Sequence, residues 1–372
     1  MAWSFKLARI AGIDVYIHAT FLMLLGWIAL MHWSQDRSLA SVFNGVGYIV
    51  ALFGCVVAHE YGHALTARRY GIRTQDITLL PIGGLARLER MPDKPSQELA
   101  VALAGPAVNV VIAAALFAWL SATGWHESAD IGVTTGALVP RIMVANAFLV
   151  AFNLLPAFPM DGGRALRALL AARMPYAEAT RLAASIGQGM AMLFGFLGLF
   201  GNPMLIFIAL FVWIGAGQEA GMVQVKSALA GVSVRSAMLT RFRALEPSQT
   251  LGDAVDLLLS GSQQDFPVAD GGRLVGMLPR STLMKALAAA GRDATVGAHM
   301  QRGCGAASPD EPLEPVLARL QDESCRTLPV LAPGGTLLGL LTLENVGELL
   351  MVISATRTGY HATASTKETH AS

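Results

Sequence analysis

Six apolar runs, each about 20 residues long, divide the first 225 residues of this 372-residue chain. A helix of that length crosses about 30 Å of hydrocarbon. The chain is 53% hydrophobic and only 14% charged, which is typical of a membrane protein. We therefore expect a polytopic α-helical membrane domain over residues 1–225, with about six transmembrane helices near residues 17–33, 45–66, 98–121, 137–155, 182–201 and 203–223.

Lysine and arginine are distributed unevenly between these runs. Loops rich in these residues stay in the cytoplasm, and residues 121–136 contain neither, so that segment is expected outside. This pattern predicts a multi-pass protein of the plasma or inner membrane with both termini in the cytoplasm. The loops expected in the cytoplasm carry Arg68, Arg69, Arg73, Arg87, Arg90 and Lys94, and then Arg164, Arg167, Arg173 and Arg181.

The composition beyond residue 225 is that of a soluble domain, and it contains an internal repeat. Pro267–Val268 in one copy matches Pro329–Val330 in the other, and each pair is followed by a Gly-Gly turn. Each copy is predicted to form a strand, an amphipathic helix, a strand that "PV" opens, a second strand and a closing helix. We expect one soluble α/β domain over residues 226–290, another over 291–355, and a disordered tail over 356–372.

The second apolar run contains "HEYGH", with His59 and His63 four residues apart. On a helix the two imidazoles lie one turn apart on the same face and can meet one cation. Glu60 can approach a water on that cation without being a ligand. This is the H-E-x-x-H arrangement of zinc peptidases, in which the glutamate transfers protons. A purely structural pair is less favoured, because ionisable groups at this depth are functional by default.

A catalytic zinc needs a third protein ligand and one open position. Asp161 follows the fourth run in "NLLPAFPMDGGR" and is expected at the same cytoplasmic depth as His59 and His63. Taken alone, an aspartate before two glycines is better explained as a helix cap or turn former. Beside H-E-x-x-H, the ligand role is the stronger prediction.

These motifs resemble the site-2 protease family of intramembrane zinc metalloproteases. This resemblance covers "HEYGH", "AGPAVN", "PIGGLARLE" and the segment from Asn153 to Gly162. The C-terminal repeat resembles a tandem pair of cystathionine-β-synthase (CBS) domains. The resemblance to site-2 proteases implies regulated intramembrane proteolysis. The enzyme would hold one zinc ion, and its substrate would be the transmembrane helix of a membrane-tethered regulator such as an anti-sigma factor. Helical backbone is bonded to itself, so the substrate must unwind locally before cleavage.

Each of three further residues has two possible roles, and two more residues have no assigned partner. Gly83 and Gly84 either present a strand edge that binds the unwound substrate or form a plain turn. Asn153 either donates to the developing oxyanion or caps a broken helix. His18 and Glu219 are expected to have structural or gating roles.

The resemblance to CBS domains implies an adenine nucleotide, bound weakly and through the second copy. That copy keeps Thr342 and has Asn345 where a ribose-binding aspartate is typical, whereas the first copy has Pro279 and Thr282 at these positions. The amide of Asn345 can still bond a hydroxyl, without charge assistance. Alternatively, the pair serves only as a platform for a homodimer.

The sequence leaves two alternatives to the protease. A CBS-regulated transporter or channel would need polar residues along a whole pathway, and this chain concentrates two histidines, a glutamate and an aspartate at one depth. An inactive scaffold is disfavoured because these four residues are intact. The formal net charge of +1 offers no basic surface, so no nucleic-acid partner is expected.

Overall fold

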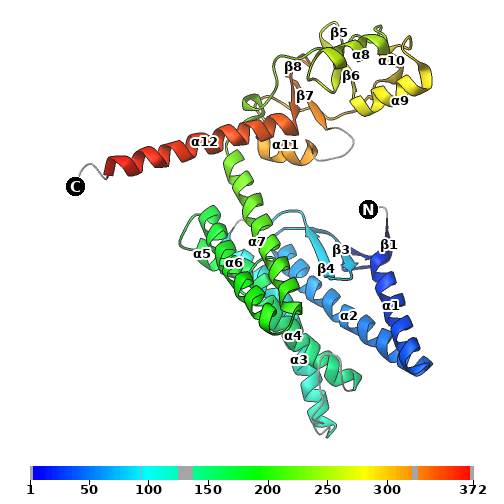
Figure 1. Ribbon diagram of the computed structural model, residues 1–372, viewed down its shortest axis with the longest axis vertical. Helices are drawn as coiled ribbons and strands as arrows, with labels where there is room; N and C mark the ends of the chain where they lie inside the picture. Colours follow the sequence, from blue (N-terminus) through cyan, green and yellow to red (C-terminus); the bar gives the residue numbers. More distant parts are fainter. Residues whose placement is uncertain (1–2, 93, 125–136, 321–325, 369–372) are drawn as a thin grey trace. The chain divides into compact units, whose positions relative to one another are not determined.

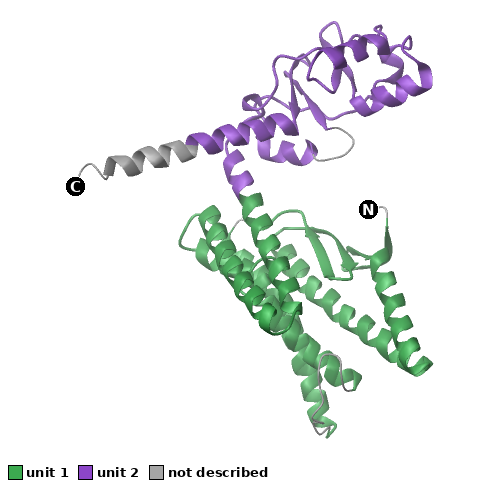
Figure 2. Cartoon of the chain, in the orientation of Figure 1, with its two compact units in different colours: residues 1–223 green, residues 224–372 purple. Residues whose placement is uncertain are grey.

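The computed structural model describes residues 3–92, 94–124, 137–320 and 326–368, with side chains described as far as residue 356. The chain forms two compact units, residues 1–223 and 224–372 (Figures 1 and 2). The first holds the apolar helices and the candidate site. The second holds the repeat.

Helices lie at all six of the positions expected for spans. They are α1 (Ala19–Asp36), α2 (Leu39–Arg69), α3 (Pro95–Ala122), α4 (Leu138–Asn153), α6 (Tyr176–Phe200) and α7 (Met204–Leu229). Among the described residues, α2, α3, α6 and α7 are long and apolar enough to cross a membrane, and α4 is apolar but only 16 residues long. By length and composition the described residues thus give four candidate spans where the sequence predicts about six. The loop expected outside lies mostly beyond the described residues.

A four-stranded sheet accompanies these helices, in the order β1-β2-β3-β4. Strands β1 (Ser4–Ile10) and β2 (Ile13–His18) form an antiparallel hairpin, β2 pairs parallel to β3 (Thr74–Leu80), and β3 pairs antiparallel to β4 (Gly83–Leu88). Strands β1 and β2 were not expected from the sequence. Their signal was the alternation of apolar and basic residues in "SFKLARI", followed by a tight turn at Ala11 and Gly12, where φ is 51° and 85°.

Four elements position the candidate site. Helix α2 has 31 residues, and its C-terminal third carries "HEYGH". Helix α3 packs along α2 and continues through Pro106. The short helix α5 (Asp161–Ala171) follows the turn after α4 and packs against α3, while β4 packs against α2. Three helices and a strand edge therefore meet around one turn of α2.

The second unit contains the two copies of the repeat, each with its own buried core. The "PV" pairs lie in β5 and β7 and the Gly-Gly turns follow them, as predicted. The sheets are β5 (Phe266–Asp270) with β6 (Arg273–Leu278) and β7 (Thr327–Leu331) with β8 (Leu337–Thr342). The helices are η1 (Val234–Ser236), α8 (Leu251–Ser260), α9 (Arg280–Ala290), α10 (Val296–His299), α11 (Leu313–Leu320) and α12 (Leu343–Glu368).

The expected disordered tail differs from the structure over part of its length. Helix α12 extends to Glu368, so residues 356–368 are helical, and 369–372 lie outside the described residues. The segment lacks an apolar period, which suggested disorder, but it also lacks proline. Nothing in it therefore interrupts the hydrogen-bonded ladder that begins at Leu343.

Candidate metal centre

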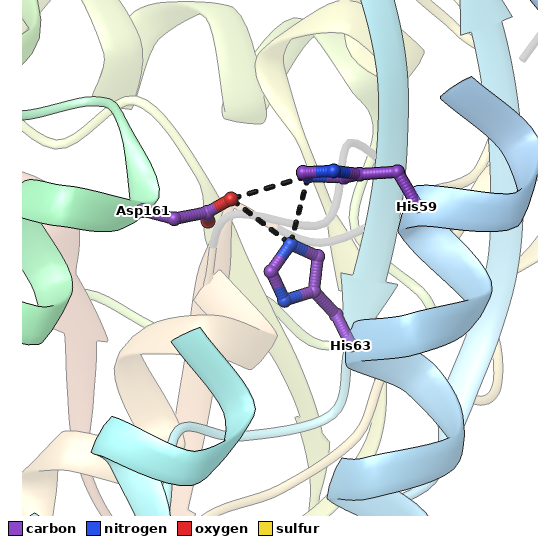
Figure 3. Close-up of side chains that lie close together, drawn as sticks. All are labelled: His59, His63 and Asp161. Atoms are coloured by element: carbon purple, nitrogen blue, oxygen red, sulfur yellow. Dashed lines mark hydrogen bonds and ion pairs between the residues drawn. The ribbon is translucent and has the colours of Figure 1, made fainter. Parts of the chain in front are cut away.

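His59, His63 and Asp161 come together in the first unit (Figure 3). Asp161 Oδ2 lies 3.2 Å from His59 Nε2 and 3.0 Å from His63 Nε2, and the two Nε2 atoms are 3.1 Å apart. All three residues are buried, with 6–7% of their surface exposed. The helical spacing on α2 brings the two imidazoles together, and α5 adds the carboxylate from 98 residues beyond His63.

The other ring nitrogen of each histidine already has a partner. His63 Nδ1 donates to the carbonyl oxygen of Val101 at 2.7 Å, and His59 Nδ1 donates to Asn109 Oδ1. These oxygens accept, so both Nδ1 atoms carry the proton in neutral rings and both Nε2 lone pairs point at the Asp161 carboxylate. Three acceptor atoms this close together repel one another unless a cation lies between them.

The geometry and the donor types fit zinc. Tetrahedral zinc with ligands at about 2.0–2.1 Å places those ligands about 3.3 Å from one another, close to the three distances here. Two imidazole nitrogens and one carboxylate oxygen are a typical catalytic set, which leaves a fourth position open for water or substrate. The hydrogen bonds at Nδ1 orient both rings as ligating histidines require.

Gly105 on α3 makes room for this group, a role the sequence analysis did not assign. A Cβ at this position would lie 2.2 Å from His63 Nε2 and 2.6 Å from His59 Nε2. The residue is buried within a continuous helix. Only glycine lets α3 pack so close to the two imidazoles.

Two glycines likewise hold Asp161 in place. Asp161 is the first residue of α5, and a Cβ at Gly162 or Gly163 would lie 2.3–2.7 Å from backbone atoms of residues 154–158. The "DGG" sequence thus lets the first turn of α5 pack directly on the turn after α4. A carboxylate in the first turn also interacts favourably with the helix dipole.

Glu60 lies beside the ligand group and next to strand β4. A Cβ at Gly84 would lie 2.7 Å from Glu60 Cγ, so the strand contacts the glutamate closely. Gly83, which begins β4, has a φ of 138° that other residues rarely adopt. Glu60 and His63 also line a cavity of about 30 Å³ with Arg164. That volume accommodates about two water molecules.

Glu219, which had no assigned partner, belongs to a buried ion cluster. Arg167 on α5 is fully buried; its Nε donates to Glu98 Oε1 at 2.8 Å and its Nη1 to Glu219 Oε1 at 2.5 Å. The guanidinium also lies 5.0 Å from the ring centroids of Phe158 and Tyr176. The cluster links α5, and with it Asp161, to α3 and α7. The only sequence signal for this cluster is that its charged residues have apolar neighbours.

The remaining candidates of the first unit make local contacts. His18 caps α1, where its Nδ1 accepts from the N–H of Thr20 at 3.3 Å. The amide nitrogen of Asn153 donates to the carbonyl oxygen of Leu149 at 3.0 Å, in the last turn of α4. Because the carbonyl of Leu149 is four residues back within the helix, this contact tests neither alternative for Asn153, and both stay predictions.

Thr342 and Asn345 lie together at the start of α12. Thr342 Oγ1 donates to Asn345 Oδ1 at 2.7 Å, and the N–H of Asn345 donates back at 3.2 Å. Both line a cavity of about 1100 Å³ between the two copies, together with Arg241, Arg280 and Arg326. In the first copy, Thr282 Oγ1 instead accepts from Gln301 Nε2 at 2.7 Å. The cavity is large enough for a nucleotide.

Comparison with known proteins matches both parts of the chain. Residues 47–135 and 126–194 match the model of peptidase family M50, and residues 234–289 match the CBS domain. A zinc metalloprotease of Methanocaldococcus jannaschii is 31% identical over 356 residues, covering 95% of this chain and 98% of that protein. Rip3 of Mycobacterium tuberculosis, also named a zinc metalloprotease, is 29% identical. The match covers 94% of this chain and 93% of Rip3.

Among solved structures, the site-2 protease from Methanocaldococcus jannaschii is 36% identical, with a TM-score of 0.43; the match covers 59% of this chain and 95% of that one. The apolar helices and the relatives define a membrane metallopeptidase that carries CBS domains. The chain belongs to peptidase family M50, the site-2 proteases, and the relatives above are named as zinc metalloproteases.

Proposed function

We propose that the chain is a zinc-dependent intramembrane endopeptidase, with His59, His63 and Asp161 as metal ligands and Glu60 as the general base. The convergence of three acceptor atoms within 3.0–3.2 Å, with both Nδ1 protons directed away, carries this proposal. Family membership gives the class of enzyme, and the geometry supports the assignment of residues.

The proposed roles follow from the chemistry of peptide hydrolysis. Zinc, when bound, polarises the scissile carbonyl and acidifies water. Glu60 takes the proton from the attacking water and returns it to the leaving amine. The cavity beside Glu60 and His63 provides space for water next to the reacting groups.

We further propose that the substrate is the transmembrane helix of a membrane-tethered regulator, bound as an added strand. Strand β4 lies at one edge of the sheet, and Gly84 within it contacts Glu60. A substrate segment that pairs with β4 would have its backbone hydrogen bonds satisfied after unwinding. This arrangement supports the substrate-edge role for Gly83 and Gly84, because pairing would place the scissile bond near the glutamate.

The ligand set is tested by the zinc content of three variants. His59→Ala, His63→Ala and Asp161→Ala are each expected to lower bound zinc and to abolish cleavage of a single-span substrate, because each removes one of three protein ligands. Elemental analysis of the purified proteins measures the zinc. Stoichiometric zinc with full activity in Asp161→Ala would remove that residue from the ligand set.

Family membership does not support the alternative of a CBS-regulated transporter or channel. The ionisable residues His59, His63 and Asp161 gather at one site rather than along a path. We therefore retain the protease as the proposed function.

We propose that both termini and the active-site end of α2 face the cytoplasm. Arg68 and Arg69 end this helix just beyond His63, and the positive-inside rule places such residues in the cytoplasm. Membrane-impermeant thiol reagents applied from outside are expected to label a Ser128→Cys variant and not a Lys94→Cys variant. The reverse pattern would overturn this orientation.

We also propose that the cavity of the second unit binds an adenine nucleotide weakly, through its second copy. Arg241, Arg280 and Arg326 supply positive charge for phosphates, and Thr342 and Asn345 lie at the cavity wall. The amide of Asn345 replaces a carboxylate, and loss of a charge-assisted bond of about 1.5–3 kcal/mol lowers affinity about ten- to hundred-fold.

Calorimetry of the full-length protein with ATP, ADP and AMP tests this proposal. Thr342→Ala and Asn345→Ala are expected to abolish the heat of binding, while Pro279→Ala and Thr282→Ala leave it unchanged. Binding that depends on Pro279 or Thr282 but not on Thr342 and Asn345 would contradict the assignment. Absence of any heat, with a dimer that dissociates when the second unit is deleted, would favour the dimerisation platform.

A further inference from the structure

A line of buried amides leads from His59 away from the metal centre. Asn109 on α3 and Asn146 on α4 are both fully buried. Asn109 Oδ1 accepts from His59 Nδ1, Asn109 Nδ2 donates to Asn146 Oδ1 at 2.7 Å, and Asn146 Nδ2 donates to the carbonyl oxygen of Ile142 at 2.8 Å. A buried amide is costly unless it is hydrogen-bonded, and here the bonds form one continuous chain.

The direction of these hydrogen bonds is fixed at the end that lies farthest from His59. The carbonyl of Ile142 can only accept, so Asn146 must present its NH₂ group there and its oxygen to Asn109. Asn109 must then donate to Asn146, which leaves its own oxygen for His59. Each amide has one orientation that satisfies both neighbours, and together they require a proton on His59 Nδ1.

The two histidines differ in how this proton is held. The partner of His63 is the backbone carbonyl of Val101, which cannot turn around within its helix. The partner of His59 is a side-chain amide, which could rotate and present its NH₂ group instead. A rotated amide would favour the other tautomer of His59, with a proton on Nε2 that points at the ligand group and blocks metal binding. Asn109 therefore needs a second residue to hold its orientation.

We propose that Asn146 is a positioning residue of the metal centre, which holds Asn109 in the orientation that leaves His59 Nε2 free to bind metal. The hydrogen bonds of Asn146 go to Asn109 and to the carbonyl oxygen of Ile142, so it acts on His59 through Asn109. This inference rests on the proposed role of His59 as a ligand.

The test measures the zinc dissociation constant of the full-length protein by competition with a chelator. Asn146→Leu, similar in size but unable to accept, is expected to weaken zinc binding by about 10- to 100-fold, the range seen when an outer partner of a ligand is lost. Asn146→Asp is expected to bind zinc as the wild type does, because a carboxyl oxygen accepts from Asn109 whether or not the group is protonated. Thermal unfolding of the metal-free proteins checks that both variants fold.

A double substitution separates positioning from packing. In Asn109→Asp, either carboxylate oxygen accepts from His59 Nδ1, so the orientation at position 109 no longer matters. Adding Asn146→Leu to this variant is therefore expected to cause no further loss of zinc affinity. An equal loss from Asn146→Leu in both backgrounds would overturn the proposal, since it would show that Asn146 acts through packing.

The same measurements distinguish this proposal from the one it rests on. Full zinc affinity in His59→Ala would overturn the ligand role of His59, and the positioning role with it. Loss of zinc in His59→Ala, together with unchanged affinity in Asn146→Leu, would overturn the positioning role alone.

Discussion

Glu60→Gln is expected to leave the zinc content unchanged and to lower the rate of substrate cleavage by about 10²- to 10⁴-fold, the contribution typical of general acid–base catalysis. Glutamine keeps the size of the side chain and its contact with Gly84 but cannot accept a proton from water. The side chains of the three proposed ligands are unchanged, so we expect metal binding to be unchanged as well. Zinc is measured by elemental analysis and cleavage with a single-span substrate in proteoliposomes.

The matched control for this variant is Glu178→Gln, the same change at an exposed position in the first turn of α6. It is expected to retain both zinc and cleavage. Wild-type cleavage by Glu60→Gln would exclude the glutamate as the general base. Loss of zinc from that variant would instead indicate that Glu60 is itself a ligand.

Gly105→Ala should abolish zinc binding and cleavage together. Its Cβ would lie 2.2 Å from His63 Nε2, in the space that the ligand atoms occupy. Helix α3 packs along α2 and cannot withdraw without breaking that contact. The expected loss of zinc affinity exceeds the roughly 10- to 100-fold that follows when only an outer partner is removed, because the ligands themselves are displaced.

Gly54→Ala on α2 is the control, because a Cβ there meets no atom within 4 Å. It should bind zinc and cleave as the wild type does. Circular dichroism tests whether the helices of both variants form. Stoichiometric zinc in Gly105→Ala would show that α2 and α3 pack less closely than the structure indicates.

The sequence predicted the parts of the site that depend on local spacing. His59 and His63 fall on one face because a helix repeats every 3.6 residues, and that geometry holds for any helix. The strand and turn positions of the repeat were likewise predicted, because alternating patterns and Gly-Gly turns are local signals. Asp161 was placed near the histidines from its depth in the membrane alone.

The contacts between distant segments could not be predicted in the same way. Arg167 meets Glu98 and Glu219 across 69 and 52 residues of sequence, and no periodic pattern connects them. Asn109 and Asn146 are polar residues with mainly apolar neighbours in their helices, and this pattern indicates burial without identifying the partner. The close approach at Gly105 depends on how two helices pack, which a single sequence does not determine.

The proposed metal centre joins two helices that are far apart in sequence. Helix α2 supplies both imidazoles from one turn, whereas Asp161 comes from α5. The distances from Asp161 Oδ2 to the two nitrogens, 3.2 and 3.0 Å, leave little tolerance for displacement of α5. The zinc content of a purified sample therefore reports whether these helices are packed correctly, without any need for substrate. It can guide the choice of detergent or lipid before an assay exists.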